Sequence, residues 1–332
     1  MRPSFFDPQK CGTMFKPDVD RAAAEGKEWA KKNGVPSSRQ DTGQSIILCL
    51  IDMQVDFIGP PASNYPGNLS VPGAVEDVQR VCQFIFDNAA KIGHIVASLD
   101  THYLYQPFHR MNWIAGSKPA SGYQEGDHPH PFTLITSQDI EKDVWRPARQ
   151  ISRMQQMVSK LESEHKKQLC IWPYHCELGT PGHALDPSLM ETIHWHSAAR
   201  SNQYDLTEKG KSQSSEHYGI LKAEVEFKDD VLTLLNVDMV NKLSKADLIY
   251  FAGEARTHCC LETLNQVASI FSQKSPEVLK RIRVLEDCMS NVPDIKDGTG
   301  RTLVPFGQIA TDRFNELKKM GFQFVKSTEP IA

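Results

Sequence analysis

One segment of the chain combines a cysteine with a predicted local structure that would activate it. The apolar run Leu248–Gly253 predicts a buried strand, and the run Ala255–Leu261, which contains Cys259, begins a segment with helical spacing. The first turn of a helix has unpaired N–H groups and the positive end of the helix dipole, and both stabilise a thiolate. Most buried cysteines are inert core residues, so this segment alone leaves both interpretations of Cys259 open.

Two aspartates directly follow apolar runs that predict buried strands. Asp52 comes after the run 45–51, and Asp100 comes after the run 94–99. A carboxylate in such a position costs free energy unless it is paired or used, and sites in open parallel sheets form beyond the carboxyl ends of the strands. Asp52 is therefore a candidate general base for a thiol, with a cap on a helix or turn as the structural alternative.

The donors of a possible metal site are spread over two segments. Asp100 and His102 form an Asp-x-His run, His109 follows shortly, and His175 lies in the run Trp172–Cys176 after another predicted strand. Two imidazoles and one carboxylate suit Zn²⁺ or Fe²⁺, with coordination positions left for water or substrate. Asp-x-His runs are common by chance, so the alternative is that these histidines lie at the surface or pack within a histidine-rich loop.

A lysine near a thiolate and a carboxylate would stabilise both the anion and a developing oxyanion. The polar stretch 200–217 contains two candidates, Lys209 and Lys211. Most lysines are simply solvated, and the local sequence does not distinguish the two.

Strands and helices alternate along the chain. The spacing of apolar residues predicts strands at 45–51, 94–99, 168–172, 248–252, 282–285 and 322–325, and helices at 75–92, 150–167, 187–199, 231–243, 259–271 and 311–320. Residues 103–147 and 200–217 are expected to be loops. This alternation predicts an α/β protein with a doubly wound, mainly parallel sheet.

The bulk composition excludes several classes of protein. The chain has 332 residues and a net charge of -4 with mixed signs, so we expect no nucleic-acid partner. No apolar run approaches the ~18–20 residues of a membrane span. The segment Met1–Lys32 lacks the apolar core of a signal peptide, and several of the eight cysteines, such as Cys49 and Cys82, lie in apolar runs. These features favour reduced thiols and a cytoplasmic location.

Taken together, these residues resemble the isochorismatase-like cysteine hydrolases, and within them the nicotinamidases. The resemblance covers roughly residues 45–290. It rests on Asp-Met-Gln-x-Asp-Phe at 52–57, Asp-x-His at 100–102, Trp-Pro-x-His-Cys at 172–176, Lys209 with Glu216 and Tyr218 after it, and Gly-x-Ala-x-x-x-Cys at 253–259, with Thr263 downstream. The nine-residue spacing from Lys209 to Tyr218 selects Lys209 over Lys211.

The resemblance implies a complete active site. It implies a catalytic triad of Cys259, Asp52 and Lys209, a metal held by Asp100, His102 and His175, an oxyanion site formed by the backbone N–H groups of Ala255 and Cys259, and a substrate pocket that includes Phe57, Trp172 and Tyr218. The metal would be Zn²⁺, with Fe²⁺ or Mn²⁺ as alternatives. It also implies a cis peptide bond between Glu254 and Ala255.

The fold that the resemblance implies is a three-layer α/β/α sandwich, the isochorismatase-like fold. In this chain it would comprise residues 45–332, with insertions near 110–168 and 177–208 and an N-terminal extension at 1–44. Because the insertions flank the metal-ligand segments, they would reshape the substrate pocket. Family members are often oligomers, so a homo-oligomer is expected.

The activity implied by the resemblance is hydrolysis of nicotinamide or a related small amide to the acid and ammonia, through a thioester on the cysteine. The alternatives are a hydrolase of the same superfamily that acts on a ureido compound or a vinyl ether, and a catalytically silent binding protein. Five residues depart from the usual family pattern: Thr101 within the metal motif, Arg256 and Thr257 in place of the commoner Thr-Asp pair, His258 before the cysteine, and Cys260 after it. Helical geometry turns Cys260 away from Cys259, so we predict a core position for Cys260, with a redox-sensitive pair of the two cysteines as the alternative.

Overall fold

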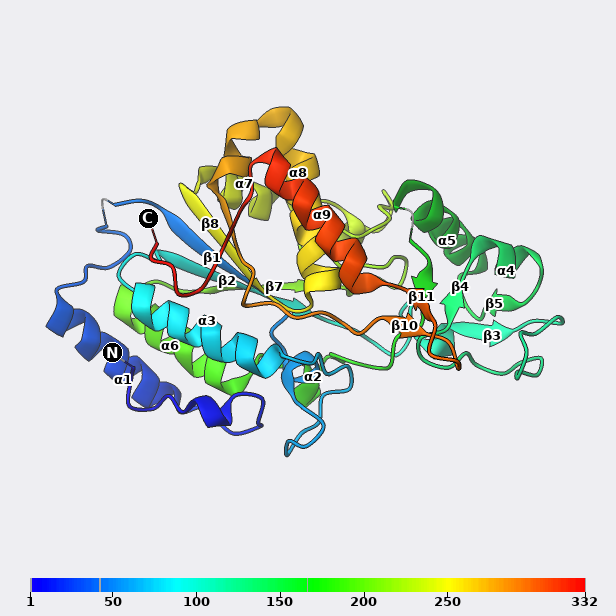
Figure 1. The fold of residues 1–332 in the computed structure, drawn as a ribbon, viewed down its shortest axis with the longest axis horizontal. Helices are drawn as coiled ribbons and strands as arrows, with labels where there is room; N and C mark the ends of the chain where they lie inside the picture. Colours follow the sequence, from blue (N-terminus) through cyan, green and yellow to red (C-terminus); the bar gives the residue numbers. More distant parts are fainter. Residues whose placement is uncertain (1, 42, 166, 332) are drawn as a thin grey trace.

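The computed structural model describes residues 2–41, 43–165 and 167–331. Within this part of the chain, a six-stranded sheet forms the centre of the molecule, in the order β12-β9-β8-β1-β2-β7, and each pair of neighbours is parallel (Figure 1). The strands are β1 (Ile46–Ile51), β2 (His94–Asp100), β7 (Asp205–Lys209), β8 (Leu248–Gly253), β9 (Ile282–Leu285) and β12 (Gln323–Val325). The predicted doubly wound sheet is therefore confirmed.

Helices cover both faces of this sheet (Figure 1). On one face lie α3 (Ala74–Asn88) and α6 (Pro187–Arg200), and on the other lie α7 (Val237–Lys245), α8 (Leu261–Lys274) and α9 (Phe306–Met320). Strand β1 is buried along its whole length, because its side chains alternate between two apolar cores. Leu48 and Leu50 pack with α3 and α6, whereas Ile47 and Cys49 pack with α7 and α8. This arrangement is the predicted three-layer sandwich.

An N-terminal helix, α1 (Val19–Asn33), adds a further layer outside α6. Asp18 caps its start by accepting a hydrogen bond from the N–H of Arg21, and Gly34 ends it in the left-handed conformation. The two helices approach closely at Gly26, where a Cβ atom would lie 2.2 Å from the carbonyl oxygen of Trp195. Helix α1 is therefore packed closely against α6.

A small lobe extends beyond the carboxyl ends of the central strands (Figure 1). It contains two short antiparallel ribbons, β3–β5 and β4–β6, and two helices. Their bounds are β3 (Trp113–Ala115), β4 (Leu134–Ile135), α4 (Ser137–Glu141), β5 (Trp145–Pro147), α5 (Ile151–His165) and β6 (Leu169–Cys170). The expectation of a loop over 103–147 was wrong in part, and the predicted strand at 168–172 pairs in this lobe instead of in the central sheet.

Two other expectations differ from the structure. The predicted loop at 200–217 contains β7, which is an edge strand of the central sheet. Its residues are polar and partly exposed, so the alternation of apolar and polar residues that usually indicates a strand is weak. The predicted helix at 231–243 is a 3₁₀ turn, Val231–Thr233, followed by α7, which Asn236 caps through the N–H of Met239. The remaining elements are short: η1 (Pro8–Lys10), α2 (Val55–Ile58), η2 (Arg110–Asn112), η3 (Pro181–His183), η6 (Pro276–Arg281), β10 (Ile295–Lys296) and β11 (Thr302–Val304).

Among the residues that the structure describes, no helix has both the length and the apolar composition needed to cross a bilayer.

The close approach of α1 to α6 leads to a test of how α1 is held. Replacing glycine by alanine inside a helix usually adds about 1 kcal/mol to its stability. At Gly26 the new methyl group would overlap the Trp195 carbonyl, so we expect Gly26→Ala to lower the free energy of unfolding by about 1–3 kcal/mol. Urea denaturation would measure the change. The exposed neighbour Lys27 provides the control, because Lys27→Ala should stay within about 0.5 kcal/mol of the wild type. A stabilised Gly26→Ala protein would contradict this packing.

Candidate active site

Four predicted site residues meet at the carboxyl edge of the central sheet. Asp52 follows β1, Asp100 ends β2, and Lys209 ends β7 in register with Asp100. Cys259 lies in a π-helical turn, Arg256–Cys260, which follows β8 and leads into α8. Adjacent parallel strands thus place three of these side chains at neighbouring strand ends, and the turn after β8 brings in the cysteine.

The Lys209 ammonium is the centre of this group. Its Nζ lies 2.9 Å from Asp52 Oδ2, 2.8 Å from Asp100 Oδ1 and 3.6 Å from Cys259 Sγ. Burial alone would lower the pKa of Lys209, but the two carboxylates raise it well above its usual value. The lysine is therefore a fixed cation between the thiol and both carboxylates. Lys211, in contrast, is directed to the surface, where it pairs with Glu208.

The thiol of Cys259 is neutral in this environment. Burial raises its pKa well above the usual value, Lys209 acts against this, and the negative charges of Asp52 and Asp100 raise it further. Burial also raises the pKa of Asp52, although Lys209 opposes the shift. A carboxylate oxygen of Asp52 lies within 4.8 Å of Cys259 Sγ, so Asp52 is close enough to take the thiol proton.

Polar residues to which the sequence assigned no role support the site. The Ser98 hydroxyl donates to Asp52 Oδ1 at 2.6 Å and accepts from the Asp52 N–H at 3.0 Å. The Gln54 side chain accepts from the Asp100 N–H at 2.7 Å and donates to the Asp100 carbonyl at 2.8 Å. Asp56 accepts from the N–H of Cys176 at 2.7 Å, which fixes the segment that contains His175. Gln54 and Asp56 of the 52–57 run therefore support the site through hydrogen bonds to the backbone.

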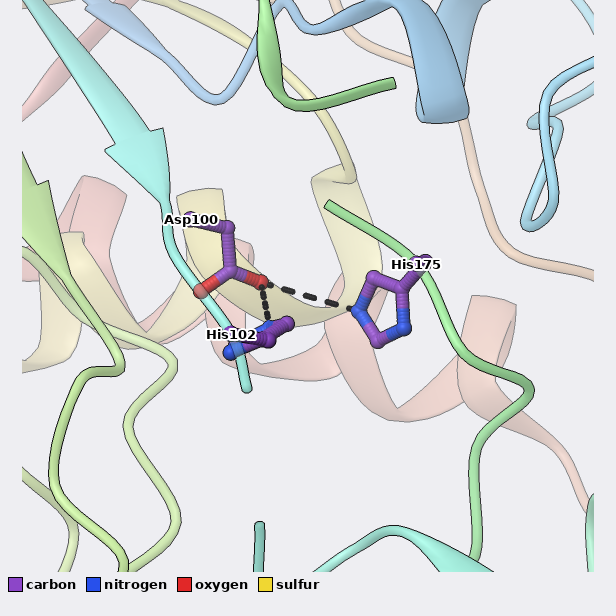
Figure 2. A group of neighbouring side chains, drawn as sticks. All are labelled: Asp100, His102 and His175. Carbon is purple, nitrogen blue, oxygen red and sulfur yellow. Dashed lines mark ion pairs between the residues drawn. The ribbon is translucent and has the colours of Figure 1, made fainter. Parts of the chain in front are cut away.

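Asp100, His102 and His175 form a cluster of donor atoms, as Figure 2 shows. Oδ2 of Asp100 lies 2.8 Å from Nε2 of His102 and 3.7 Å from Nε2 of His175, and the three ligand atoms all lie within 4.8 Å of one another. The Nδ1 atom of His175 donates to the Pro173 carbonyl at 2.8 Å, and Nδ1 of His102 lies 3.4 Å from the Gly210 carbonyl. These contacts place the proton on Nδ1 and direct the Nε2 lone pairs toward Asp100.

The cluster fits a divalent cation. Nε2 of His102 is buried and makes no hydrogen bond within the described residues, despite its short distance to Asp100 Oδ2. Burial would raise the pKa of Asp100, but its charged neighbours, Lys209 among them, hold it well below its usual range, so the donor is a carboxylate. Gly210 is required beside the cluster, because a Cβ there would lie 2.7 Å from Cε1 of His102. His109 is buried next to His102 but is not part of the donor cluster.

A small cavity lies between the thiol and the donor cluster. The three predicted pocket residues, Phe57, Trp172 and Tyr218, line it together with Ala255 and Cys259. The centre of a water molecule can reach about 30 Å³ of this space, so the cavity is narrow. The peptide bond between Glu254 and Ala255 is cis, as predicted.

Two further residues near the cavity differ in their relation to the site. Glu216, which the sequence used only to select Lys209, lines the cavity, and burial raises its pKa to about 8, so this carboxyl is largely protonated at neutral pH. Cys260 does not line the cavity and is buried in the core between the sheet and α8. Its predicted core position is confirmed.

Comparisons with known proteins support the fold. No family model and no curated protein sequence matches this chain. Solved structures that do match include the yeast nicotinamidase bound to the inhibitor nicotinaldehyde, with a TM-score of 0.50 and 17% identity over 85% of this chain and 99% of that one. A nicotinamidase and pyrazinamidase from Acinetobacter baumanii matches with a TM-score of 0.49 and 18% identity, over 87% of this chain and 99% of that one.

A third structure is a pyrazinamidase from Pyrococcus horikoshii in complex with zinc. Its TM-score is 0.45, with 15% identity over 85% of this chain and 99% of that one. At these identities the likeness concerns the fold, and among these three the yeast protein has the highest TM-score. The chain therefore has an isochorismatase-like fold, related to that of the nicotinamidases.

Proposed function

We propose that the protein is a metal-containing cysteine amidohydrolase that converts a small aromatic amide, such as nicotinamide, to the acid and ammonia. The observation that supports this most is the position of the Lys209 ammonium, which contacts Cys259 Sγ and both buried carboxylates. This grouping provides a nucleophile, a base and a fixed cation at one cavity. The yeast protein of the same fold is a nicotinamidase, which is consistent with the proposal.

The first half of the reaction forms a thioester. Asp52 accepts the proton of the Cys259 thiol, and the thiolate attacks the carbonyl carbon of the amide. The N–H groups of Ala255 and Cys259, with Lys209 nearby, stabilise the oxyanion. The C–N bond then breaks, and the proton held by Asp52 goes to the leaving nitrogen, so that ammonia departs and the acyl group stays on the sulfur.

The second half releases the acid. Asp52, now ionised again, takes a proton from a water molecule as the water attacks the thioester carbonyl. The C–S bond breaks and the proton returns to the sulfur, which regenerates the neutral thiol that burial favours. Asp100, His102 and His175 would hold a divalent cation, for which Zn²⁺ suits the donors best, and the cation would supply a Lewis acid that orients the ring or carbonyl of the substrate.

The roles of the two adjacent cysteines can be separated by mutation. Cys259→Ala should reduce ammonia release from nicotinamide by at least about a thousandfold, because no other group replaces the nucleophile. Cys260→Ala should keep most of the activity, since this side chain lies in the core. An ammonia assay on both proteins, with circular dichroism to verify folding, makes the comparison. The reverse pattern would show that the nucleophile is assigned wrongly.

Lys209 should matter for both activity and stability. In Lys209→Met, two buried carboxylates lose their shared cation, so we expect the free energy of unfolding to fall by about 3–5 kcal/mol and ammonia release to fall more than about a hundredfold. Lys211→Met is the matched control and should change stability by less than about 0.5 kcal/mol. Chemical denaturation and the ammonia assay test both expectations, and equal behaviour of the two variants would refute the role of Lys209.

The donor cluster can be tested by metal analysis. His175→Ala removes one of three donors, so purified protein should contain well below one metal ion per chain by mass spectrometry. His130 is exposed and lies outside the cluster, and His130→Ala should leave the metal content as in the wild type. An unchanged metal content in His175→Ala would rule out this site.

A further inference from the structure

A second and larger cavity adjoins the catalytic one. Its volume is about 500 Å³, within the range of typical ligand sites, compared with about 30 Å³ beside Cys259. Its walls come from separate parts of the chain that Figure 1 shows side by side: the small lobe, β11 and the helix pair α8 and α9. Leu134 and Cys170 of the lobe face Leu261 of α8 and Val304 and Ile309 of the C-terminal part.

The two cavities share one aromatic wall. Trp172, Tyr218 and His258 line both of them, and we call these three residues the aromatic partition. The Trp172 Nε1–H donates to the Tyr218 hydroxyl at 3.2 Å, and the His258 ring lies 5.2 Å from the Trp172 ring and 5.5 Å from the Tyr218 ring. Cys259 lines the smaller cavity on one side of this partition, and the larger cavity lies on the other side.

The partition carries no charge of its own at neutral pH. Burial lowers the pKa of His258 to about 3, so its imidazole is neutral. Its Nδ1 is hydrogen-bonded to the Thr257 hydroxyl at 2.9 Å, and that hydroxyl oxygen accepts from the Val292 N–H. On its other side the ring contacts Phe306 of α9, with 4.5 Å between ring centroids. His258 therefore joins the wall of the catalytic cavity to the wall of the larger one.

The charges of the larger cavity are compensated. Lys167 pairs with Glu262 at 2.7 Å and with Glu224 at 3.0 Å. Arg313 pairs with Glu316 and donates to Asn265 at 2.6 Å. Because both cations already have carboxylate partners and much of the remaining wall is aliphatic or aromatic, the cavity favours an uncharged, apolar group.

We propose that this cavity binds the non-reacting part of the substrate, so that the protein prefers primary amides that carry an uncharged aromatic extension over nicotinamide itself. This inference rests on the proposed function, because it assumes that the amide lies against Cys259. The extension passes the aromatic partition and packs among Leu134, Val304 and Ile309. The added apolar contact increases affinity for the longer amide.

Binding can be measured separately from turnover. In metal-loaded Cys259→Ala protein, calorimetric titration compares nicotinamide with nicotinamides that carry a phenyl group at each free ring carbon. We expect the best phenyl derivative to bind at least about tenfold tighter than nicotinamide, because burying a phenyl group is worth a factor of this order. Equal or weaker binding by all of the phenyl derivatives would overturn the inference.

A matched pair of variants locates the bound group. Ile309 lines the cavity and is 49% exposed, whereas Leu303, which is 48% exposed, does not line it. Ile309→Glu places a charge against the bound extension, so the affinity ratio between the phenyl derivative and nicotinamide should fall at least about fivefold. Leu303→Glu should leave this ratio unchanged. A ratio that falls equally in both variants, or in neither, would contradict binding in this cavity.

Because Val304→Trp fills the same space, it gives a second test that does not depend on charge. It should lower the affinity ratio too, and a ratio as in the wild type would count against the cavity. Wild-type protein incubated with the same amides tests the proposed function independently. If no ammonia appears although the phenyl derivative binds as expected, the cavity is assigned correctly and the amidohydrolase activity is wrong. If ammonia appears while the ratio stays near one, the activity is correct and this inference fails.

Discussion

The charge balance of the candidate site depends on one interaction, the contact of the Lys209 ammonium with two buried carboxylates. Asp52 follows β1 and Asp100 ends the neighbouring strand β2, and without a cation between them the two carboxylates could not both remain ionised at low cost. The same ammonium lies within 3.6 Å of the Cys259 sulfur. Lys209 therefore links the two parts of the site, because Asp52 lies next to Cys259 and Asp100 is one of the three residues of the donor cluster.

Much of the polar sequence around the site serves to fix this contact. Ser98 orients Asp52, Gln54 clamps the backbone of Asp100 on both sides, and Gly210 leaves room for the His102 ring. These groups touch neither the sulfur nor the cavity, but they determine where the carboxylates point. Residues of the small lobe and of α9 line the larger cavity, so these two segments form the surroundings of the site on that side.

The sequence predicted the sheet and most of the site because buried parallel strands have long apolar runs and because motif residues lie at strand ends. The sequence did not reveal β7, because the half-exposed residues of this strand show no apolar periodicity. Lys209 was therefore identified only by the spacing of a motif, in a segment that was predicted to be a loop. The sequence also did not show that His258, which departs from the family pattern, lies between two cavities. Such relations depend on contacts between segments far apart in the chain, which local spacing does not report. The division into an extension, a domain and two insertions, and the expected homo-oligomer, remain predictions.

The position of β7 has a consequence for how the protein would lose its site on heating. Within the described sheet, β7 is an edge strand that pairs only with β2, and it ends at Lys209. Edge strands open at lower free energy than central ones because fewer contacts must be broken. Local opening of β7 would withdraw the ammonium while the other strands stay paired. Because opening β7 should cost less free energy than unfolding the whole sheet, the site would be the first part of the domain to be lost on heating.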